Sequence, residues 1–521
     1  MSDWKCLLLG LYLSVLMLLA MPAPGRQEDE LVRGNGGEPE TLDPHLMQGA
    51  PEGWIAYDLF EGLVTYDNKG QLIPGQAQSW KVEDNGRKWV FHLRKDLKWS
   101  DGTPLTANDF EYSYRRLADP KTAAAYSWFM EGMEISNATA VIRGRKPVEQ
   151  LGVKATSPER LEFYLDSPVS YFSELLAFYG FLPVPRHVVE AKGSKWTLPE
   201  NIVSNGAFKL QQWRVNEKIR AVRNPLYRDH SSTRLDTVVY ITGGDELSRF
   251  RSGEIDITNN VKLEHENWVL KNRPEWLRTE RWMSTGVMFL NLRNQHLQRK
   301  ANRMALALDR DAIARSRAAG TAEAAWQVVP PHFDGFRPDM AKELTETLDK
   351  RTERARELLH GMSEIGITYC LNCGNESRIA IATAQEWQKR LRIKVHLQGY
   401  ERKHFHSVLA EGRYDIAVIQ WIGPYQDPAS LLNILQSDSA NNRSFYKNQG
   451  YDELLLKARS MVGNDPERMT LYGKAEELLM KDAPVIPVVH HRNVRLVSER
   501  VEGYLGLNPM GRLYSRYLSL N

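Results

Sequence analysis

The stretch DLFEGLVTYDNKGQLIPGQAQSWKVEDNGRKWVFHLRKDLKWSDGTPLTANDF, residues 58–110, decides the fold. Its short runs of alternating apolar residues, such as residues 89–93, are separated by turn sequences. These turns are Asn68-Lys69-Gly70, Asn85-Gly86 and Asp101-Gly102. Alternation of period two, interrupted by turns that contain Gly, is typical of strands joined in a β-meander. The stretch therefore predicts a β-meander early in the chain.

A helix follows this meander, and the rest of the chain mixes helices with strands. Thr106 is expected to cap the helix, with Asp109 in its first turn. Apolar runs predict strands at residues 286–292, 367–371, 394–397, 414–421 and 485–489. Spacing near 3.6 predicts helices at residues 300–317, 351–360, 379–391 and 467–480, the last capped by Asp465. This order indicates an α/β architecture.

Length and charge limit the class of protein. A chain of 521 residues is too long for a single core and predicts about three domains. The formal net charge is only +3, whereas a nucleic-acid binder concentrates positive charge on one face. We therefore expect no nucleic-acid partner. The sequence shows no hydrolase elbow, phosphate-binding loop or His-Glu-x-x-His pattern, so it gives no support for an enzyme.

The first 25 residues are typical of a secretory signal peptide. Lys5 gives a weakly positive start, residues 6–21 are uncharged and apolar, and small residues follow up to Gly25. A retained membrane anchor is the alternative, but a spanning helix usually needs about 20 apolar residues. Cys6 precedes the apolar run, which argues against a lipid anchor at this cysteine. We expect cleavage after Gly25 or Ala23 and export of the mature chain.

Cleavage would leave two cysteines, Cys370 and Cys373. Two cysteines in an oxidising compartment favour one local disulfide. A Cys-x-x-Cys pair also occurs in redox enzymes and in half of a zinc site. Those functions need a thioredoxin-like βαβ context or two further ligands at matching spacing, and neither is evident here. A local disulfide or free thiols are therefore favoured over redox or metal chemistry.

Several short motifs in a fixed order resemble one family. The chain resembles the extracytoplasmic solute-binding proteins of ABC transporters, family 5, which include the oligopeptide- and dipeptide-binding proteins. The resemblance covers essentially the whole mature chain. Its marks are residues 41–44 (TLDP), 58–63 (DLFEGL), 77–109, 205–208 (NGAF), 251–256 (RSGEID), 305–310 (ALALDR), Trp421 with 427–428 (DP), and 483–487 (APVIP).

The resemblance implies a fold like that of periplasmic binding proteins, type II and cluster C-like. Such a fold has two α/β lobes, a hinge and an inserted third domain. The implied division is residues 26–60, 186–280 and 489–521 for lobe I, 61–185 for the inserted domain, and 281–488 for lobe II. A ligand would be enclosed between the lobes, and the closed form would dock on a membrane permease whose partner is a cytoplasmic ATPase. We expect a periplasmic monomer without a cofactor.

The resemblance also gives candidate ligand-binding positions. They are Gln48, Tyr126, Asn259, Asn260, Arg402, Trp421, Pro424, Tyr425 and Asp427. Peptide binders of this family typically have an aspartate where this chain has Pro424, three residues after the position matched to Trp421. That aspartate holds the amino group of the peptide. Proline offers neither a charge nor a donor.

Other departures from the family pattern also indicate a cargo that differs from an ordinary short peptide. Gln48 stands where an acidic residue is often found, and Arg402 stands at the position of a pocket tryptophan. Val418 replaces an expected arginine, and Glu376 lies where a histidine can meet a ligand carboxylate. These changes remove anchors suited to a zwitterionic short peptide. They favour a peptide or peptide-like solute with a modified amino end, with a murein peptide or a bile-salt-like amphipathic solute as alternatives.

Several candidate residues have a structural interpretation beside the functional one. Asp427 could replace the missing carboxylate, but its place before Pro428 favours capping of the following helix. Arg402 could clamp a carboxylate if it points inward, or be an exposed helix residue. The aromatic candidates could belong to the core, and the Asn259-Asn260 pair could form a turn.

Metal binding and a non-transport role are the remaining alternatives. His404 and His406 are two residues apart on an expected helix, so they do not share a face. The His490-His491 pair is likewise not expected to hold a metal. A receptor or chaperone with the same fold would bind solute without transport, and a gene neighbourhood without permease and ATPase genes would favour that function.

Overall fold

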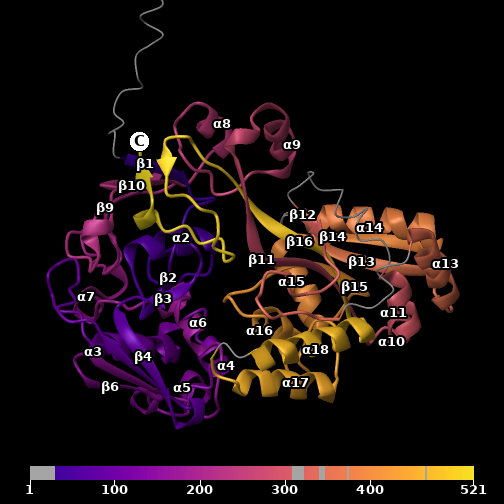
Figure 1. The fold of residues 1–521 in the computed structure, drawn as a ribbon, viewed down its shortest axis with the longest axis horizontal. Coiled ribbons are helices and arrows are strands. Elements are labelled where there is room, and N and C mark those ends of the chain that lie inside the picture. Colours follow the sequence, from indigo (N-terminus) through magenta and orange to yellow (C-terminus); the bar gives the residue numbers. More distant parts are fainter. Residues whose placement is uncertain (1–29, 308–321, 340–346, 372, 374, 464–465) are drawn as a thin grey trace, which may run out of the picture.

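The computed structural model describes residues 30–307, 322–339, 347–371, 373, 375–463 and 466–521. The expected signal peptide, residues 1–25, lies outside this part of the chain, as does the expected cap Asp465. Figure 1 shows two lobes joined by two long strands, β11 (Leu277–Leu290) and β16 (Val485–Leu496). These two strands pair antiparallel over most of their length, so they form one ribbon between the lobes.

The first lobe contains a four-stranded sheet in the order β1-β10-β9-β8. β1 (Glu30–Gly34) pairs parallel with β10 (Thr237–Ile241), and the other pairs are antiparallel. The remaining elements of this lobe are β9 (Lys218–Arg223), β8 (Phe208–Arg214), α2 (Ala50–Leu59), α7 (Arg186–Lys192), α8 (Glu246–Arg251) and α9 (Leu263–Asn272). The C-terminal segment returns to this lobe through β17 (Val501–Glu502) and β18 (Ser519–Leu520) (Figure 1).

The stretch at residues 58–110 forms the strands that its sequence predicts. β2 (Val64–Tyr66) and β3 (Leu72–Pro74) form a hairpin across the turn at Asn68–Gly70. β4 (Ala77–Glu83) and β5 (Lys88–Leu93) form a second hairpin across Asn85-Gly86, where both residues have positive φ. β7 (Arg160–Tyr164) and β6 (Val153–Ser157) extend the second hairpin into a sheet of order β4-β5-β7-β6.

Helix α3 (Ala107–Ala118) begins where the capping sequence predicts. Thr106 is the N-cap residue, and its backbone N–H donates to the Asp109 carboxylate at 2.8 Å. The hydrophobic face of α3 covers the sheet β4-β5-β7-β6. The expected capping box is therefore confirmed. Three short helices complete this part of the chain: α4 (Phe129–Gly132), α5 (Ala138–Ile142) and α6 (Phe172–Leu176).

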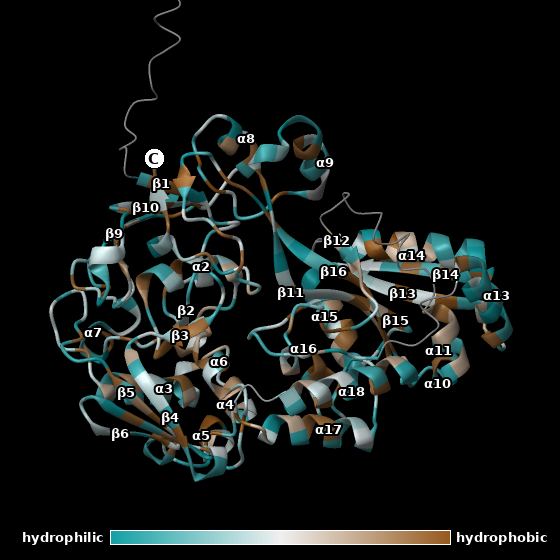
Figure 2. Ribbon diagram, in the orientation of Figure 1, coloured by the Kyte–Doolittle hydropathy of each residue, from teal (hydrophilic) through white to brown (hydrophobic). Residues whose placement is uncertain are grey.

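The second lobe contains a six-stranded sheet in the order β12-β16-β11-β15-β13-β14. Its strands β13 (Glu364–Cys370), β14 (Lys394–Tyr400) and β15 (Ile416–Ile422) are mutually parallel where they pair. The other elements are β12 (Ala322–Ala324), α10 (Gln295–Gln298), α11 (Lys300–Leu306), α13 (Leu348–Leu358), α14 (Glu376–Leu391), α15 (Arg402–Glu411), α16 (Ala429–Leu432), α17 (Gln449–Ser460) and α18 (Pro466–Asp482). In Figure 2, hydrophobic residues gather on the inner strands, whereas outer helices such as α13 are largely polar.

Two predicted elements differ in extent from the structure. The predicted strand at residues 286–292 is the end of β11, which begins at Leu277 because its polar first half pairs with β16. The apolar run at 485–489 is likewise only the first part of β16. Of the predicted helix at residues 300–317, the described part is α11, and residues 308–317 lie outside the described chain.

Candidate binding cleft between the lobes

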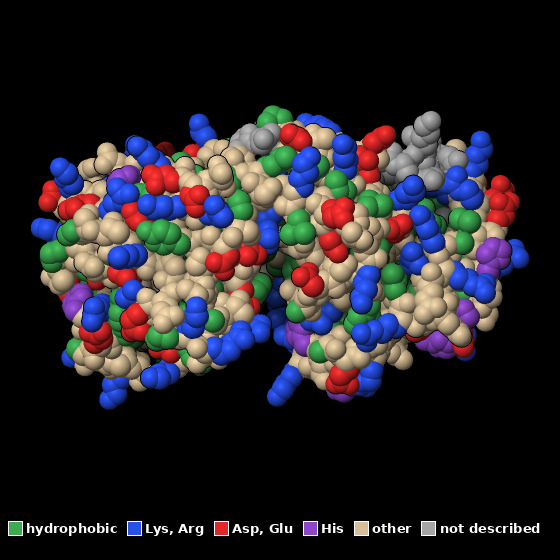
Figure 3. Space-filling view, turned by 90° about the horizontal axis from the view of Figure 1, so that it is seen from below, with side chains coloured by type: hydrophobic (Ala, Val, Ile, Leu, Met, Phe, Trp, Pro, Cys, Tyr) green, Lys and Arg blue, Asp and Glu red, His purple; other side chains and the backbone are tan. Residues whose placement is uncertain are grey.

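A groove separates the two lobes when the molecule is seen from below (Figure 3). Lys and Arg side chains lie around the mouth of this groove in that view. The lobes are connected across it by the ribbon of β11 and β16 (Figure 1). The two sides also meet at a second place, where Tyr425 stacks on Tyr171 and Arg459 pairs with Glu134 at 2.8 Å. The width of the groove therefore depends on these contacts as well as on bending of the ribbon.

Several predicted positions lie where parallel strands of the second lobe end. β13 runs parallel to both β14 and β15, so the carboxyl ends of all three strands meet at one edge. Arg402 follows β14, Pro424 follows β15, and Trp421 is within the last residues of β15. Ligands of open α/β sheets bind at this kind of edge. This edge of the sheet can therefore form one side of a binding site.

The Cys370–Cys373 pair lies at the same edge, directly after β13. The two cysteines form a disulfide with their Cα atoms 5.5 Å apart. Leu371, between them, donates its backbone N–H to the Tyr400 carbonyl at the end of β14, at 2.9 Å. The disulfide therefore belongs to a short loop that is tied to the neighbouring strand.

An aromatic wall is formed by four side chains that pack on one another, Tyr57, Tyr126, Phe178 and Tyr179. The Tyr126 hydroxyl donates to the Gln48 carbonyl at 3.0 Å, and the Tyr179 hydroxyl donates to the Tyr126 hydroxyl at 3.1 Å. Phe178 packs edge-on against Tyr126 with ring centroids 4.9 Å apart. The Tyr57 ring lies 6.1 Å from the Tyr179 ring. The structure thus brings together two predicted residues, Gln48 and Tyr126, and adds buried aromatic neighbours to them.

Arg512 connects this wall to the opposite lobe. Its guanidinium lies 4.9 Å from the centroid of the Tyr57 ring. Its Nη1 donates to the Ala177 carbonyl at 2.9 Å, and its Nη2 donates to the Pro424 carbonyl at 3.2 Å. One buried side chain from the C-terminal segment therefore touches the aromatic wall, the residue after α6 and the loop that follows β15.

Trp421 and Tyr425 flank Pro424 but differ in exposure. The half-buried Trp421 donates its Nε1–H to the Ser430 carbonyl at 3.2 Å. Tyr425 is buried and stacks on Tyr171 with ring centroids 4.9 Å apart. Burial raises the pKa of Tyr425 well above its usual value. Trp421 is the more accessible of the two to a ligand, whereas Tyr425 packs against the segment before α6.

Asp427 is fully engaged by protein groups. Its carboxylate forms an ion pair with Arg468 of α18, and its Oδ1 accepts the Ala429 N–H at 2.9 Å. Arg468 also donates to the Ser170 hydroxyl at 3.4 Å. Pro428 is the N-cap residue of α16, and the Asp427 carboxylate lies one residue before it, bonded to the first N–H of the helix. The two partners leave Asp427 little capacity for a ligand cation.

Asn259 and Asn260 lie beside α8 in the first lobe. The Asn259 N–H donates to Glu246 Oε2 at 2.6 Å, and the Asn259 carbonyl accepts from Arg495 Nε at 3.3 Å. Asn260 lines a cavity of about 300 Å³ together with Thr242 and His265, among others. Burial raises the pKa of Glu246, although backbone N–H groups of this segment lower it. Asn259 lies at a bend of the chain, not in a turn, and Asn260 borders the cavity.

The other sequence candidates have simpler surroundings. Arg402 is the first residue of α15 and is exposed. His404 stacks on Tyr400 at 4.8 Å, and His490 meets the Thr285 hydroxyl at 3.0 Å. Within the described ranges, no group of three or more His, Cys, Asp or Glu side chains could hold a metal ion.

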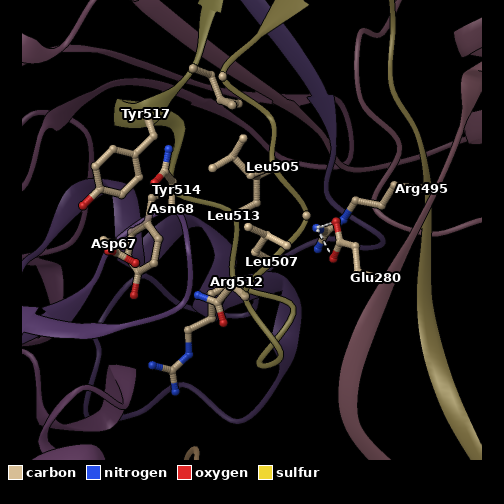
Figure 4. Close-up of a pocket in the computed structure, with 14 residues that line it drawn as sticks. Asp67, Asn68, Glu280, Arg495, Leu505, Leu507, Arg512, Leu513, Tyr514 and Tyr517 are labelled. Atoms are coloured by element: carbon tan, nitrogen blue, oxygen red, sulfur yellow. Dashed lines mark hydrogen bonds and ion pairs between the residues drawn. The ribbon is translucent and has the colours of Figure 1, made fainter. Parts of the chain in front are cut away.

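The ribbon between the lobes carries a buried polar cluster, which Figure 4 shows beside the C-terminal segment. Glu280 of β11 accepts from Arg495 of β16 at 3.2 Å and from Asn493 at 2.8 Å. The Tyr504 hydroxyl also donates to Glu280. Arg495 Nη2 donates to the Gly511 carbonyl at 2.7 Å. This cluster fixes the two strands to the segment that presents Arg512.

Sequence reasoning missed Arg512, Tyr57 and Tyr179. Arg512 lies 88 residues after Pro424, in a segment to which no family motif was matched. The only available signal was its local composition, Arg512-Leu513-Tyr514-Ser515-Arg516-Tyr517, which is rich in residues that recognise ligands.

Among the helices of the described chain, none combines the length and apolar character that crossing a bilayer requires.

Comparison with known proteins places this geometry in context. The family model of bacterial extracellular solute-binding proteins, family 5 Middle, matches residues 71–443. The chain is 39% identical over 503 residues to the periplasmic oligopeptide-binding protein OppA of Salmonella typhimurium, covering 94% of this chain and 92% of that protein. It is 36% identical over 495 residues to the probable deoxycholate-binding periplasmic protein YgiS of Escherichia coli, covering 93% and 92%.

A solved structure shares the whole architecture. The periplasmic murein tripeptide binding protein MppA, in its unliganded open form, matches with a TM-score of 0.83 and 34% sequence identity. The match covers 95% of this chain and 98% of that one. These likenesses confirm the predicted α/β fold with two lobes.

Proposed function

The chain belongs to the bacterial extracellular solute-binding proteins of family 5, and we propose that it is the exported substrate-binding subunit of an ABC importer. It captures a peptide or peptide-like solute between its two lobes. It then delivers the solute to a permease in the inner membrane, whose cytoplasmic ATPase supplies the energy. The protein acts as a periplasmic monomer after loss of its signal peptide, and it binds its solute without chemical conversion.

One observation carries this proposal: a series of contacts joins the two lobes through Arg512. The aromatic wall of Tyr126 and Tyr179 leads through Tyr57 to Arg512, which contacts Pro424 of the opposite lobe. A solute held between these walls would contact both lobes and so favour the closed form. The relatives named for oligopeptide and murein tripeptide binding support a peptide-like cargo.

The cargo is expected to differ from an unmodified short peptide at its amino end. An unpaired buried charge is costly, so a free ammonium group needs a carboxylate partner. Pro424 supplies none, and the neighbouring Asp427 is paired with Arg468. Main-chain hydrogen bonds to an extended ligand would supply affinity that is independent of the peptide sequence.

A non-peptide amphipathic solute is the second candidate. Tyr126, Phe178 and Tyr179 pack edge-on into an aromatic cluster, and Trp128, which stacks on the neighbouring Phe129, is 47% exposed. Aromatic side chains of this kind bury apolar ring systems well. A relative named as a probable deoxycholate-binding protein supports this alternative.

Mass spectrometry of the ligand released from protein purified without denaturation tests the proposal. We expect a peptide-like mass whose fragments contain amino-acid residues and whose amino end does not react with an amine reagent. Release of a steroid-like amphiphile would support the second candidate. Absence of any bound solute, together with no thermal stabilisation by a panel of peptides and bile salts, would contradict solute binding.

A further inference from the structure

Arg512 is a buried cation that has no carboxylate partner in the described part of the chain. The residue is 6% exposed, and its guanidinium donates to the main-chain carbonyls of Ala177 and Pro424, with the Tyr514 hydroxyl as a further neighbour. Its nitrogens lie more than 4.0 Å from every described carboxylate oxygen. Figure 4 shows the guanidinium extending away from the other residues of the C-terminal segment, such as Leu505 and Leu513. By contrast, the buried Arg495 is paired with Glu280.

Most acidic groups of the surrounding elements have other partners, although Glu52 Oε2 is buried without a hydrogen-bond partner among the described residues. Asp427, in the loop after β15, is paired with Arg468. Glu174 of α6 accepts from the Tyr66 hydroxyl, and burial raises the pKa of Glu174 to about 7. Glu52 of α2 accepts the Glu40 N–H at 3.1 Å through Oε1. Asp58 is paired with Arg33, and Glu61 with Arg228 and Arg516. Arg512 therefore has no directly paired carboxylate, although its charge lowers the pKa of the nearby Glu174 against the larger effect of burial.

We propose that Arg512 binds an anionic group at the end of the cargo that lies against Pro424, so the cargo class is a peptide-like solute with a carboxylate or comparable anion in place of a free amino end. This inference rests on the proposed function and names the substrate class for the same groove. It reverses the sign of charge at that end of the ligand, compared with an unmodified peptide.

The geometry of the guanidinium suits this role. It lies against the faces of Tyr57 and Tyr66, at 4.9 and 5.0 Å from their centroids, which fixes its plane without using its N–H donors. Its contact to the Pro424 carbonyl, at 3.2 Å, is the longer of its two hydrogen bonds and the one that crosses between the lobes. Opening of the lobes would break this contact, and a ligand anion would then take the place of the carbonyl.

An incoming anion would gain more than the carbonyl that it replaces. A hydrogen bond between two charged groups is roughly twice as strong as a neutral one, and a guanidinium can hold a carboxylate with two parallel bonds. Enclosure of the groove lowers the local dielectric and strengthens the pairing further. Because a buried unpaired cation is unfavourable, the ligand anion also removes a cost already present in the free protein.

Three tripeptides that differ only at the amino end test the inference. They are N-succinyl-Ala-Ala-Ala, N-acetyl-Ala-Ala-Ala and unmodified Ala-Ala-Ala, which place charges of opposite sign or none at that end. Calorimetry at pH 7 on ligand-stripped mature protein should give the tightest binding for the succinyl peptide, by about 10-fold or more over the other two. R512Q should abolish this preference, R512K should keep part of it, and R145Q, at an exposed arginine of the early domain, should leave it unchanged.

The possible results separate this inference from the proposed function. Equal binding of the succinyl and acetyl peptides by the wild-type protein would overturn the role of Arg512 and leave peptide binding intact. Tightest binding of the unmodified peptide would also overturn it and would point to Glu52 as the anchor of the amino group. Failure of all three peptides to bind would contradict peptide binding itself and the inference with it. If R512Q does not fold, the ranking in the wild-type protein and in R512K decides.

Discussion

Arg512 donates its Nη2–H to the main-chain carbonyl of Pro424, 88 residues earlier in the chain, at 3.2 Å. This hydrogen bond joins the C-terminal segment of the first lobe to the loop that follows β15 in the second. It also places a positive charge beside a position whose side chain is neutral. The charge at this point of the groove is therefore set by two segments that are distant in sequence.

Replacement of Pro424 by aspartate should restore binding of a free amino end. The new carboxylate would lie near Arg512, which would compete with a ligand ammonium group for it. We therefore expect a modest gain in affinity for Ala-Ala-Ala in P424D and a larger gain, about 10-fold or more, in the double variant P424D/R512Q. Calorimetry with the unmodified and acetylated peptides measures both effects. An equal gain for the acetylated peptide would contradict the explanation, because that peptide has no ammonium group.

The Glu280–Arg495 pair should be essential for stability of the connection between the lobes. Both side chains are nearly fully buried, and removal of one leaves the other charge without a partner. We expect E280A to lower the free energy of unfolding by about 3–5 kcal/mol. Denaturant unfolding followed by circular dichroism provides the measurement.

A matched control for this prediction is the exposed pair of Glu190 and Arg186. Their side chains are 52% and 58% exposed and form an i,i+4 pair on α7. E190A should change the unfolding free energy by less than about 1 kcal/mol, because exposed pairs contribute little. If E280A were as mild as E190A, the buried cluster would not be what holds the two strands and the C-terminal segment together.

The disulfide between Cys370 and Cys373 should make a small contribution to stability. It closes a loop of very few residues, and the loss of loop entropy in the unfolded chain grows with loop length. We expect the double variant C370S/C373S to lose about 2 kcal/mol or less. The wild-type mature protein should show no thiol that reacts with Ellman's reagent after denaturation without reductant. Two reactive thiols per chain would show that the exported protein lacks this disulfide.

Local patterns predicted the secondary structure around residues 58–110 because the information is contained in short segments. Gly86 follows Asn85 where both residues need positive φ, and Thr106 with Asp109 forms a capping box over four residues. Such features depend on backbone conformation and neighbouring side chains alone. The extents of β11 and β16 were less predictable, because their polar halves are strands only by virtue of pairing with each other.

The site was predictable only where a family motif marks a position. Of the positions that the resemblance marks, the structure joins Gln48 and Tyr126 by a hydrogen bond, which the sequence did not predict. The roles of all candidate residues, and the division into three domains, remain predictions. Arg512 could not be foreseen, because its position depends on how the C-terminal segment folds back over the ribbon of β11 and β16, and no local pattern encodes that path.

Buried Glu476 should give the protein a specific dependence of stability on pH. The side chain lies on α18, and its two oxygens accept the N–H groups of Val328 and Val329 at 2.8 and 3.1 Å. Burial raises the pKa of Glu476 from the usual 4.5 of a glutamate to about 7, although these two hydrogen bonds lower it. The folded protein therefore holds a proton on this carboxyl between pH 4.5 and 7 that the unfolded chain has lost.

The sign of the effect follows from this difference in bound protons. Where the folded state binds more protons, stability falls as the pH rises, so Glu476 should lower the unfolding free energy between pH 4.5 and 7, by on the order of 3 kcal/mol in total. Buried His490, whose pKa burial lowers to about 3, acts in the opposite direction, so any Glu476 variant must be compared with wild type at each pH.

The variant E476Q tests this prediction. It should be less stable than wild type at acidic pH, because one amide N–H of the glutamine then faces a backbone N–H. Its stability should nevertheless depend less steeply on pH than that of wild type. E190Q, at an exposed position, should reproduce the wild-type slope. Parallel wild-type and E476Q profiles from pH 4.5 to 7 would mean that Glu476 is already ionised in the folded protein, with the two backbone N–H groups outweighing the effect of burial.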